Sequence, residues 1–167
     1  EVCSVLGTAM RLELYDPSSE ITVLAVCFVM LVLLFVSFKV RMKSFRIFSV
    51  MLGMLIGATC ADLMLHYLMD LDPNMPKAVF YTFRSIYHIL LFGILHHFII
   101  YTCEATLLGP NSRKPYTRAA TALLIVFSLA DTIGIFTGQT MHIIDGVISF
   151  EGSLIFTVGY LLFVILL

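Results

Sequence analysis

Five polar side chains interrupt three otherwise apolar stretches of the chain, and their types could support chemistry. Asp62 and His66 lie in one stretch, Arg84 and His88 in the next, and Asp131 in a third. Within each of the first two stretches the polar residues are four apart, a spacing that puts both side chains on one face of a helix. A carboxylate or guanidinium in hydrocarbon costs roughly 3 kcal/mol on insertion scales, so in a membrane each charge needs a partner.

The composition indicates that a membrane does surround these stretches. Hydrophobic residues make up 60% of the 167 residues and charged residues 13%, and the mean hydropathy is +1.01. Soluble domains are about half apolar and about a quarter charged, and a chain of this length cannot hide so much apolar surface from water. The net charge of −1 gives no basic face for nucleic acid. We therefore expect an integral membrane protein.

The predicted fold class is all-α, a transmembrane helix bundle with a short extracellular β-hairpin. Apolar runs of this length are typical of membrane-spanning helices. The predicted domains are an extracellular N-terminal segment, 1–19, and a transmembrane bundle, 20–167. The predicted spans cover about 20–38, 47–69, 77–107, 119–137 and 153–167. Because the chain opens on Glu1 and closes within an apolar run, we expect it to be a piece of a longer protein.

Local signals place the connections between these spans. Asp16 and Pro17 favour a helix start, and Gly109 suits the residue just after a helix end. Asp145-Gly146, flanked by apolar β-branched residues, predicts a hairpin with a tight turn. The loops after the first and third spans carry only basic charges: Lys39, Arg41, Lys43 and Arg46, then Arg113, Lys114 and Arg118. Basic loops stay in the cytoplasm, so the N-terminus and the hairpin are predicted to lie outside the cell membrane.

Depth brings the polar residues into one layer. At about 1.5 Å per residue, Asp62 and Arg84 each lie roughly 10 Å below the outer ends of their spans, and Asp131 roughly 9 Å. We predict a cluster of these three groups with His66 and His88 at its edges. Arg84 would neutralise one carboxylate, and the other would need a proton, a histidine, water or a ligand. Three interpretations stay open: polar contacts that only fix helix register, a small-molecule binding site, or a proton relay or metal site, since histidine and carboxylate are competent ligands.

The remaining polar and small residues point to packing. His96 and His97 lie toward the cytoplasmic half, with Glu104 near that interface. A haem would need histidines on facing helices at the same depth, and the other spans have none there, so we do not predict a haem. Gly53, Gly57 and Ala61 recur every four residues, which favours close helix approach. The four cysteines, Cys3, Cys27, Cys60 and Cys103, have neither metal nor disulfide spacing. No catalytic constellation is present, so no enzyme activity, metal or cofactor is predicted for these residues.

Several strings resemble a known family. They are Tyr15–Ile21 ahead of the first span, Arg46-Ile47-Phe48 ahead of a span with Asp62, a third span ending near Leu108-Gly109, Asp131–Phe136, and Asp145-Gly146 followed by Gly152 and Tyr160. Together they are similar to the multi-helix membrane sensor regions that precede GGDEF diguanylate cyclases in gut Firmicutes. The resemblance implies an N-out bundle of seven helices joined to a bacterial cytoplasmic domain that makes cyclic di-GMP from GTP. Arg84, His96 and His97 depart from the family's pattern.

The function predicted from these observations is a membrane-embedded sensor or input module for signal transduction. Its expected partners are the lipid bilayer, a covalently linked cytoplasmic output domain, a small extracellular ligand and, as one assembly, a second copy of the chain as a homodimer. Related seven-helix regions precede some histidine kinases, so that output stays open. A small-solute transporter is a further alternative, although the spans show no interruption at mid-depth of the kind transporters use.

Overall fold

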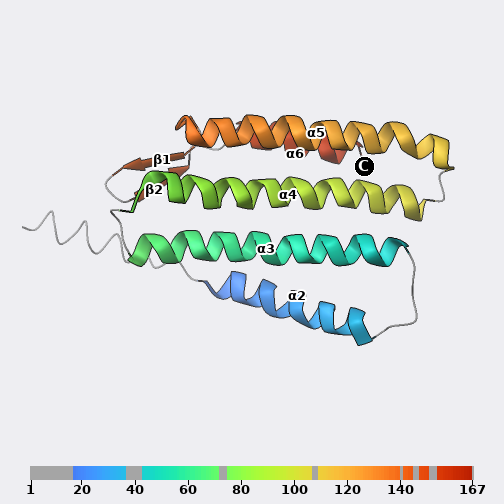
Figure 1. Cartoon of the computed structure of the whole chain (residues 1–167), viewed down its shortest axis with the longest axis horizontal. Helices are drawn as coiled ribbons and strands as arrows, with labels where there is room; N and C mark the ends of the chain where they lie inside the picture. The colour runs from blue at the N-terminus through green and yellow to red at the C-terminus, as the bar shows by residue number, and fades with distance from the viewer. Residues whose placement is uncertain are drawn as a thin grey trace, which may run out of the picture.

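The computed structural model of the chain shows helices lying side by side, with a small hairpin at one end (Figure 1). The structure describes residues 17–36, 43–71, 75–106, 109–139, 141–144, 147–150 and 154–166. Within these residues the elements are α2 (Ser18–Val36), α3 (Lys43–Leu71), α4 (Lys77–Ala105), α5 (Pro110–Phe136), β1 (Met141–Ile144), β2 (Val147–Phe150) and α6 (Leu154–Leu166). Successive helices from α2 to α5 are neighbours, and α6 packs against both α4 and α5.

Within the described residues, three helices have the length and composition to cross a membrane. They contain the segments Phe45–Met69, Lys77–Ala105 and Arg113–Phe136, while the apolar segments Ser18–Leu34 and Ile155–Leu166 are shorter. The long hydrophobic runs therefore do form helices, as the sequence predicts. The apolar segments of α2 and α6 are shorter than a typical span. A five-span arrangement therefore stays a prediction.

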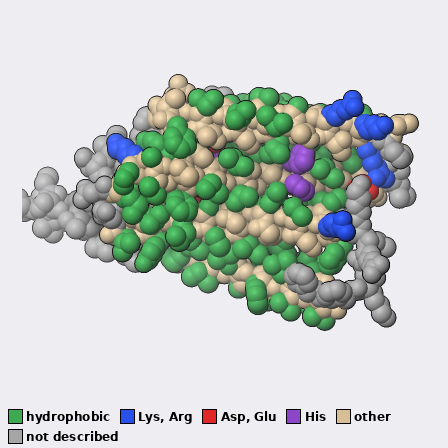
Figure 2. Space-filling view, in the orientation of Figure 1, with side chains coloured by type: hydrophobic (Ala, Val, Ile, Leu, Met, Phe, Trp, Pro, Cys, Tyr) green, Lys and Arg blue, Asp and Glu red, His purple; other side chains and the backbone are tan. Residues whose placement is uncertain are grey.

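Large apolar side chains cover the outside of the bundle as well as its interior. Figure 2 shows hydrophobic side chains spread over the face in view, with several Lys and Arg side chains gathered at one end. Phe28, Val126 and Ile165 are 66%, 58% and 78% exposed. In water, contiguous exposed apolar surface on this scale marks a site of contact with lipid or with another protein. The exposed surface is thus compatible with a membrane protein.

Two apolar clusters hold the helices together. One joins α4, α5 and α6 through Phe92, Ile99, Cys103, Ala120 and Phe163. The second lies at the other end and joins α3, α4 and α5 through Leu65, Phe80 and Ile135. Between these two clusters lies the depth at which the sequence predicts the polar layer.

Glycines bring α3 and α4 close together. A methyl group added to Gly57 would lie 3.2 Å from Leu90 of α4, and one added to Gly93 would lie 3.0 Å from Met54 of α3. At Gly53 an added methyl would meet no atom within 4 Å. Of the three residues of the predicted packing stripe, Gly57 lies against α4, Ala61 is buried, and Gly53 faces open space.

Two helices, α3 and α5, extend past the hydrophobic runs that predict the spans. α5 begins at Pro110 rather than at residue 119, so Arg113, Lys114 and Arg118 are helical rather than in a loop. Gly109 precedes α5 as its N-cap with φ −58°, and Pro110 occupies the first helical position, which suits its fixed φ. Gly109 is therefore not the left-handed residue that the sequence suggested after α4, which ends at Ala105.

Helix α3 is longer than predicted for the same reason. It begins at Lys43, four residues before its apolar run, and continues to Leu71. Lysine and arginine are good helix formers, so a basic flank extends a helix that apolar packing has already started. The predicted N-cap, Asp16, lies outside the described residues, and the first turn of α2 closes from Ile21 N–H to the carbonyl of Pro17 at 2.9 Å.

Strands β1 and β2 pair antiparallel, with Ile144 opposite Val147 and Met141 opposite Phe150. Residues 145 and 146 separate the strands and lie outside the described residues. The extracellular position of the turn stays a prediction. The hairpin joins α5 to α6 and lies at the end of the bundle where α4 begins (Figure 1). We call this the hairpin end, and the opposite end, where α3 and α5 begin, the basic end.

Candidate functional site

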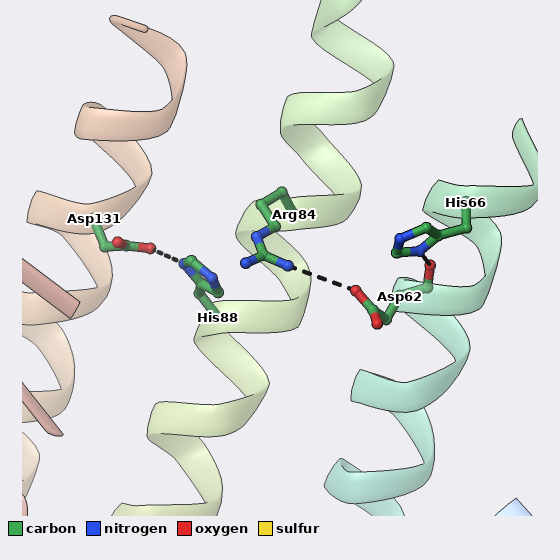
Figure 3. A network of polar contacts seen from close by, with 5 residues as sticks. All are labelled: Asp62, His66, Arg84, His88 and Asp131. Atoms are coloured by element: carbon green, nitrogen blue, oxygen red, sulfur yellow. Dashed lines mark hydrogen bonds and ion pairs between the residues drawn. The ribbon is translucent and has the colours of Figure 1, made fainter. Parts of the chain in front are cut away.

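Four of the five predicted polar residues form two contacts between neighbouring helices. Figure 3 shows Arg84 and His88 on α4, with Asp62 of α3 on one side and Asp131 of α5 on the other. α4 lies between α3 and α5 in the bundle, and the i, i+4 spacing puts Arg84 and His88 one turn apart. We call these four residues the polar layer. It lies toward the hairpin end.

The contact between Asp62 and Arg84 is long and partly open. Arg84 Nη1 lies 3.6 Å from Asp62 Oδ1, and the side chains are 19% and 17% exposed. The Arg84 guanidinium also lies over the ring of Tyr87, with 5.0 Å from its central carbon to the ring centroid. An ion pair of this length and exposure contributes little to stability by itself.

The contact between His88 and Asp131 is short and buried. His88 Nδ1 donates to Asp131 Oδ2 at 2.5 Å, and the two side chains are 9% and 1% exposed. A carboxylate this deep costs several kcal/mol of lost hydration, so a close, charge-assisted hydrogen bond has to compensate. The sequence left open whether the second carboxylate meets a proton, a histidine, water or a ligand. In the structure the partner of Asp131 is His88.

His66 lies beside the polar layer and bonds within its own helix. Its Nδ1 donates to the backbone carbonyl of Asp62 at 2.9 Å, and this contact runs along α3 rather than across to another helix (Figure 3). The bond orients the imidazole ring beside the Asp62–Arg84 pair. It does not pair His66 with the Asp62 carboxylate.

The polar layer holds more acidic than basic side chains. Asp62 and Asp131 bring two carboxyl groups, and Arg84 brings one guanidinium. Since uncompensated charge in a low-dielectric interior is costly, the hydrogen bond from His88 has to stabilise the carboxyl group of Asp131.

Aromatic rings connect the polar layer to α6. The His88 ring lies 4.6 Å from the Phe156 ring of α6. Phe156 lies 5.1 Å from Phe92 of α4, and Phe92 lies 6.0 Å from Phe163, near the end of α6. His88 therefore contacts α5 through a hydrogen bond and α6 through ring packing, and the ring contacts continue along α6 toward the basic end.

Two serine hydroxyls lie near the His88–Asp131 pair in sequence. Ser85 precedes His88 by one helical turn, Ser128 precedes Asp131 by one turn, and both Oγ atoms are buried without a hydrogen-bond partner among the described residues. Buried hydroxyls normally find a partner. Both hydroxyls therefore keep hydrogen-bonding capacity within one turn of the pair.

Two further polar contacts join α4 and α5 nearer the basic end. His96 Nε2 lies 3.1 Å from Thr121 Oγ1, and Arg113 Nη1 lies 2.6 Å from Glu104 Oε2. His97 instead donates to the carbonyl of Gly93 within α4, at 2.9 Å. The residues of α4 that make these polar contacts with α5 are His88, His96 and Glu104, which are eight residues apart.

The described residues offer no metal site and no disulfide. No group of three or more His, Cys, Asp or Glu side chains is placed to hold a metal ion in that part of the chain. Cys27, Cys60 and Cys103 are free thiols, and Cys3 lies outside the described residues.

Some residues of this site were not predicted from the sequence. Tyr87 and Phe156 look like ordinary membrane aromatics, and only packing shows that they contact Arg84 and His88. The Glu104–Arg113 pair could have been found, because opposite charges flank a short connection between two helices. Phe156 had no such signal, because it depends on the angle at which α6 returns after the hairpin.

Comparisons with known proteins do not assign the chain to a family. No protein-family model, no curated protein and no solved structure matches it. The resemblance to sensor regions of diguanylate cyclases therefore remains a proposal, as does any function drawn from it.

Proposed function

We propose that the chain is the membrane-embedded input module of a bacterial signalling protein. In this proposal α2 to α6 cross the cell membrane five times, with the hairpin end outside and the basic end in the cytoplasm. The excess of Lys and Arg at the basic end supports this orientation, since positive residues stay on the cytoplasmic side. The large exposed apolar side chains support contact with lipid.

The contact of His88 with both Asp131 and Phe156 is the observation that carries the sensory role. A signal that changes the hydrogen bond between His88 and Asp131 also changes the packing of the His88 ring on α6. Helix α6 then continues toward the cytoplasmic side. A ligand or proton shifts such a protein only if it binds two helix packings with different affinity, and a buried ion pair that forms in one packing provides that difference.

The resemblance to sensor regions makes a GGDEF diguanylate cyclase the output domain that we propose for the full-length protein, regulated through α6. A histidine kinase is the second candidate. In either case the output domain is covalently linked and lies beyond these 167 residues, and the signal is a small extracellular species that reaches the polar layer from the hairpin end.

The test uses the full-length gene product in cells that report cyclic di-GMP. His88→Phe keeps an aromatic ring against Phe156 and removes the bond to Asp131, so we expect the basal cyclic di-GMP level to change at least about threefold, the equivalent of somewhat over 0.6 kcal/mol. Val126→Ala, on the exposed face of α5, is the control and leaves the level unchanged. Both variants must reach the membrane in equal amounts.

Two results would overturn the proposal. A reading frame that stops without any cytoplasmic output domain removes the input role. A full-length cyclase or kinase whose activity is the same with His88→Phe as with Val126→Ala removes the coupling through α6. Autophosphorylation in place of cyclic di-GMP synthesis would retain the input role and assign the histidine kinase output.

A further inference from the structure

A shallow, wide-open hollow lies on the outer surface of α5, near the basic end and away from the polar layer. Its volume is about 370 Å³, and it is lined by Thr117, Arg118, Thr121, Ala122 and Ile125. The spacing of these residues puts them on one face of the helix. Most of them are exposed, and Ile125 is 54% exposed, so the hollow opens toward the surroundings of the bundle rather than into its core.

Arg118 distinguishes this hollow from the rest of the basic end. Its neighbour Arg113 is paired with Glu104 at 2.6 Å, and Lys114 donates to Asn111 at 3.3 Å. Within the part of the chain that the structure describes, no hydrogen bond or ion pair is recorded for the exposed Arg118. The hollow therefore has an exposed positive charge at one end that no described carboxylate neutralises.

The hydroxyl groups of the hollow are already engaged. Thr117 donates to the carbonyl of Arg113 at 3.2 Å, and Thr121 donates to the carbonyl of Thr117 at 2.8 Å while it lies 3.1 Å from His96 Nε2. The other end of the hollow is formed by Ala122 and Ile125 and is apolar. A matching ligand has an anionic group at one end and an apolar chain at the other.

The depth of the hollow suits a lipid. The 27 residues of α5 span about 40 Å, and the hydrocarbon layer is about 30 Å thick, so each helix end projects by about 5 Å. Arg118 lies eight residues after Pro110, or about 12 Å along the axis, which places its backbone about 7 Å inside the hydrocarbon. An arginine at this depth extends its guanidinium to the headgroup layer, while Ile125 lies about 10 Å deeper, among acyl chains.

We propose that this hollow binds one anionic glycerophospholipid of the cytoplasmic leaflet. Arg118 binds the lipid phosphate, and one acyl chain lies over Ala122 against Ile125. This inference rests on the membrane embedding proposed above and is independent of any sensory role. The bound lipid shields the charge of Arg118 at the edge of the hydrocarbon and fills a gap beside the α4–α5 contact at His96 and Thr121.

The test is a lipid titration of the full-length protein in non-ionic detergent, followed by native mass spectrometry with phosphatidylglycerol as the probe. Arg118→Gln weakens binding of the first lipid about fivefold, in line with the attraction of one basic residue near an anionic surface. Arg46→Gln is the matched control, because Arg46 is an exposed arginine at the same end of the bundle and its loss changes the net charge equally. The control weakens binding less than twofold.

A second variant tests the shape of the site without a change of charge. Ala122→Leu fills the floor of the hollow and keeps Arg118, so we expect it to weaken the first lipid at least threefold. Circular dichroism shows whether each variant keeps its helices, and Ala122→Leu serves as the test if Arg118→Gln does not fold.

Three results would overturn the site. Equal losses with Arg118→Gln and Arg46→Gln mean diffuse attraction of lipid to a basic surface. Unchanged binding in Arg118→Gln and Ala122→Leu means that lipid binds elsewhere. Displacement of the lipid by inorganic phosphate alone means a site for the free anion. None of these results removes the membrane embedding, which labelling of the loops tests separately.

Discussion

The two faces of α4 are held by different kinds of contact. Toward α3 the helices approach at Gly57 and Gly93, where side chains of the partner helix fill the space above each glycine. The ion pair of Asp62 with Arg84 in this interface is 3.6 Å long and partly exposed. Toward α5, polar contacts recur at three depths, and the deepest is almost fully buried. The face of α4 toward α3 is thus distinguished by close packing at glycines, and the face toward α5 by its hydrogen bonds.

This difference shows where a change of charge can act. The glycine contacts between α3 and α4 involve apolar side chains, and the charged groups of that interface are Asp62 and Arg84. The buried pair between α4 and α5 touches α6 as well, through Phe156. We therefore expect substitutions at His88 and Asp131 to affect both stability and the proposed output, and substitutions at the glycine contacts between α3 and α4 to affect stability alone.

The largest effect is expected at the buried pair. Asp131→Ala leaves His88 buried without its carboxylate, and removal of one partner of a buried pair costs about 3 kcal/mol or more. Equilibrium unfolding in mixed micelles measures the loss. The double variant His88→Phe with Asp131→Leu replaces both groups by apolar ones and recovers most of the stability. A loss below about 1 kcal/mol for Asp131→Ala, the range of an ordinary hydrogen bond, would show that the pair is not buried as described.

A smaller effect is expected where the α3–α4 contact depends on shape. Gly57→Leu pushes a side chain into Leu90, which a methyl at this position would already approach to 3.2 Å, and overpacking of this kind costs about 1–3 kcal/mol. Gly53→Leu, the same substitution one turn away on the same helix, faces open space and retains stability. Unfolding in mixed micelles compares the two, and equal losses would contradict the close approach at Gly57.

The Asp62–Arg84 pair is expected to contribute less than either of these. A double-mutant cycle of Asp62→Asn and Arg84→Met should give a coupling of about 0.6 kcal/mol, the average for polar contacts between membrane helices. The same cycle between His88 and Asp131 should give a clearly larger value. A larger coupling energy for Asp62 with Arg84 than for His88 with Asp131 would mean that the ion pair, and not the buried hydrogen bond, is the stronger contact of the polar layer.

The smallest effect belongs to the Glu104–Arg113 pair at the basic end. Its side chains are 15% and 25% exposed, and pairs close to water contribute about 0.2–1 kcal/mol. Glu104→Gln should lower the unfolding free energy within that range, and added salt should shrink the difference because it screens exposed charges. A loss that salt leaves unchanged would indicate that the pair is buried instead.

Much of this organisation could be predicted from residue types and spacing. Unbroken apolar runs predict helices, and the depths of Asp62, Arg84 and Asp131 place them in one layer, because helix rise per residue is fixed. What spacing cannot supply is the rotation of each helix about its axis. That rotation decides that Arg84 meets Asp62, that His88 meets Asp131, and that His66 bonds within its own helix.

Helix boundaries and helix-to-helix fit were the weaker predictions. The start of α5 at Pro110 was missed because its first two turns are polar and basic, and hydropathy does not detect a helix that extends beyond the hydrocarbon. Gly53 and Gly57 look alike in the sequence, yet only Gly57 faces α4. The contact of Phe156 with His88 depends on how the hairpin returns the chain, which no local pattern predicts.

The most direct test of the central claim, that a bilayer surrounds these helices with the basic end in the cytoplasm, is cysteine labelling in cells. In a background without the four native cysteines, a membrane-impermeant maleimide should label Asp145→Cys in intact cells and Lys43→Cys only after permeabilisation. Labelling of Lys43→Cys from outside, or purified protein that stays monodisperse in buffer without detergent, would contradict the account.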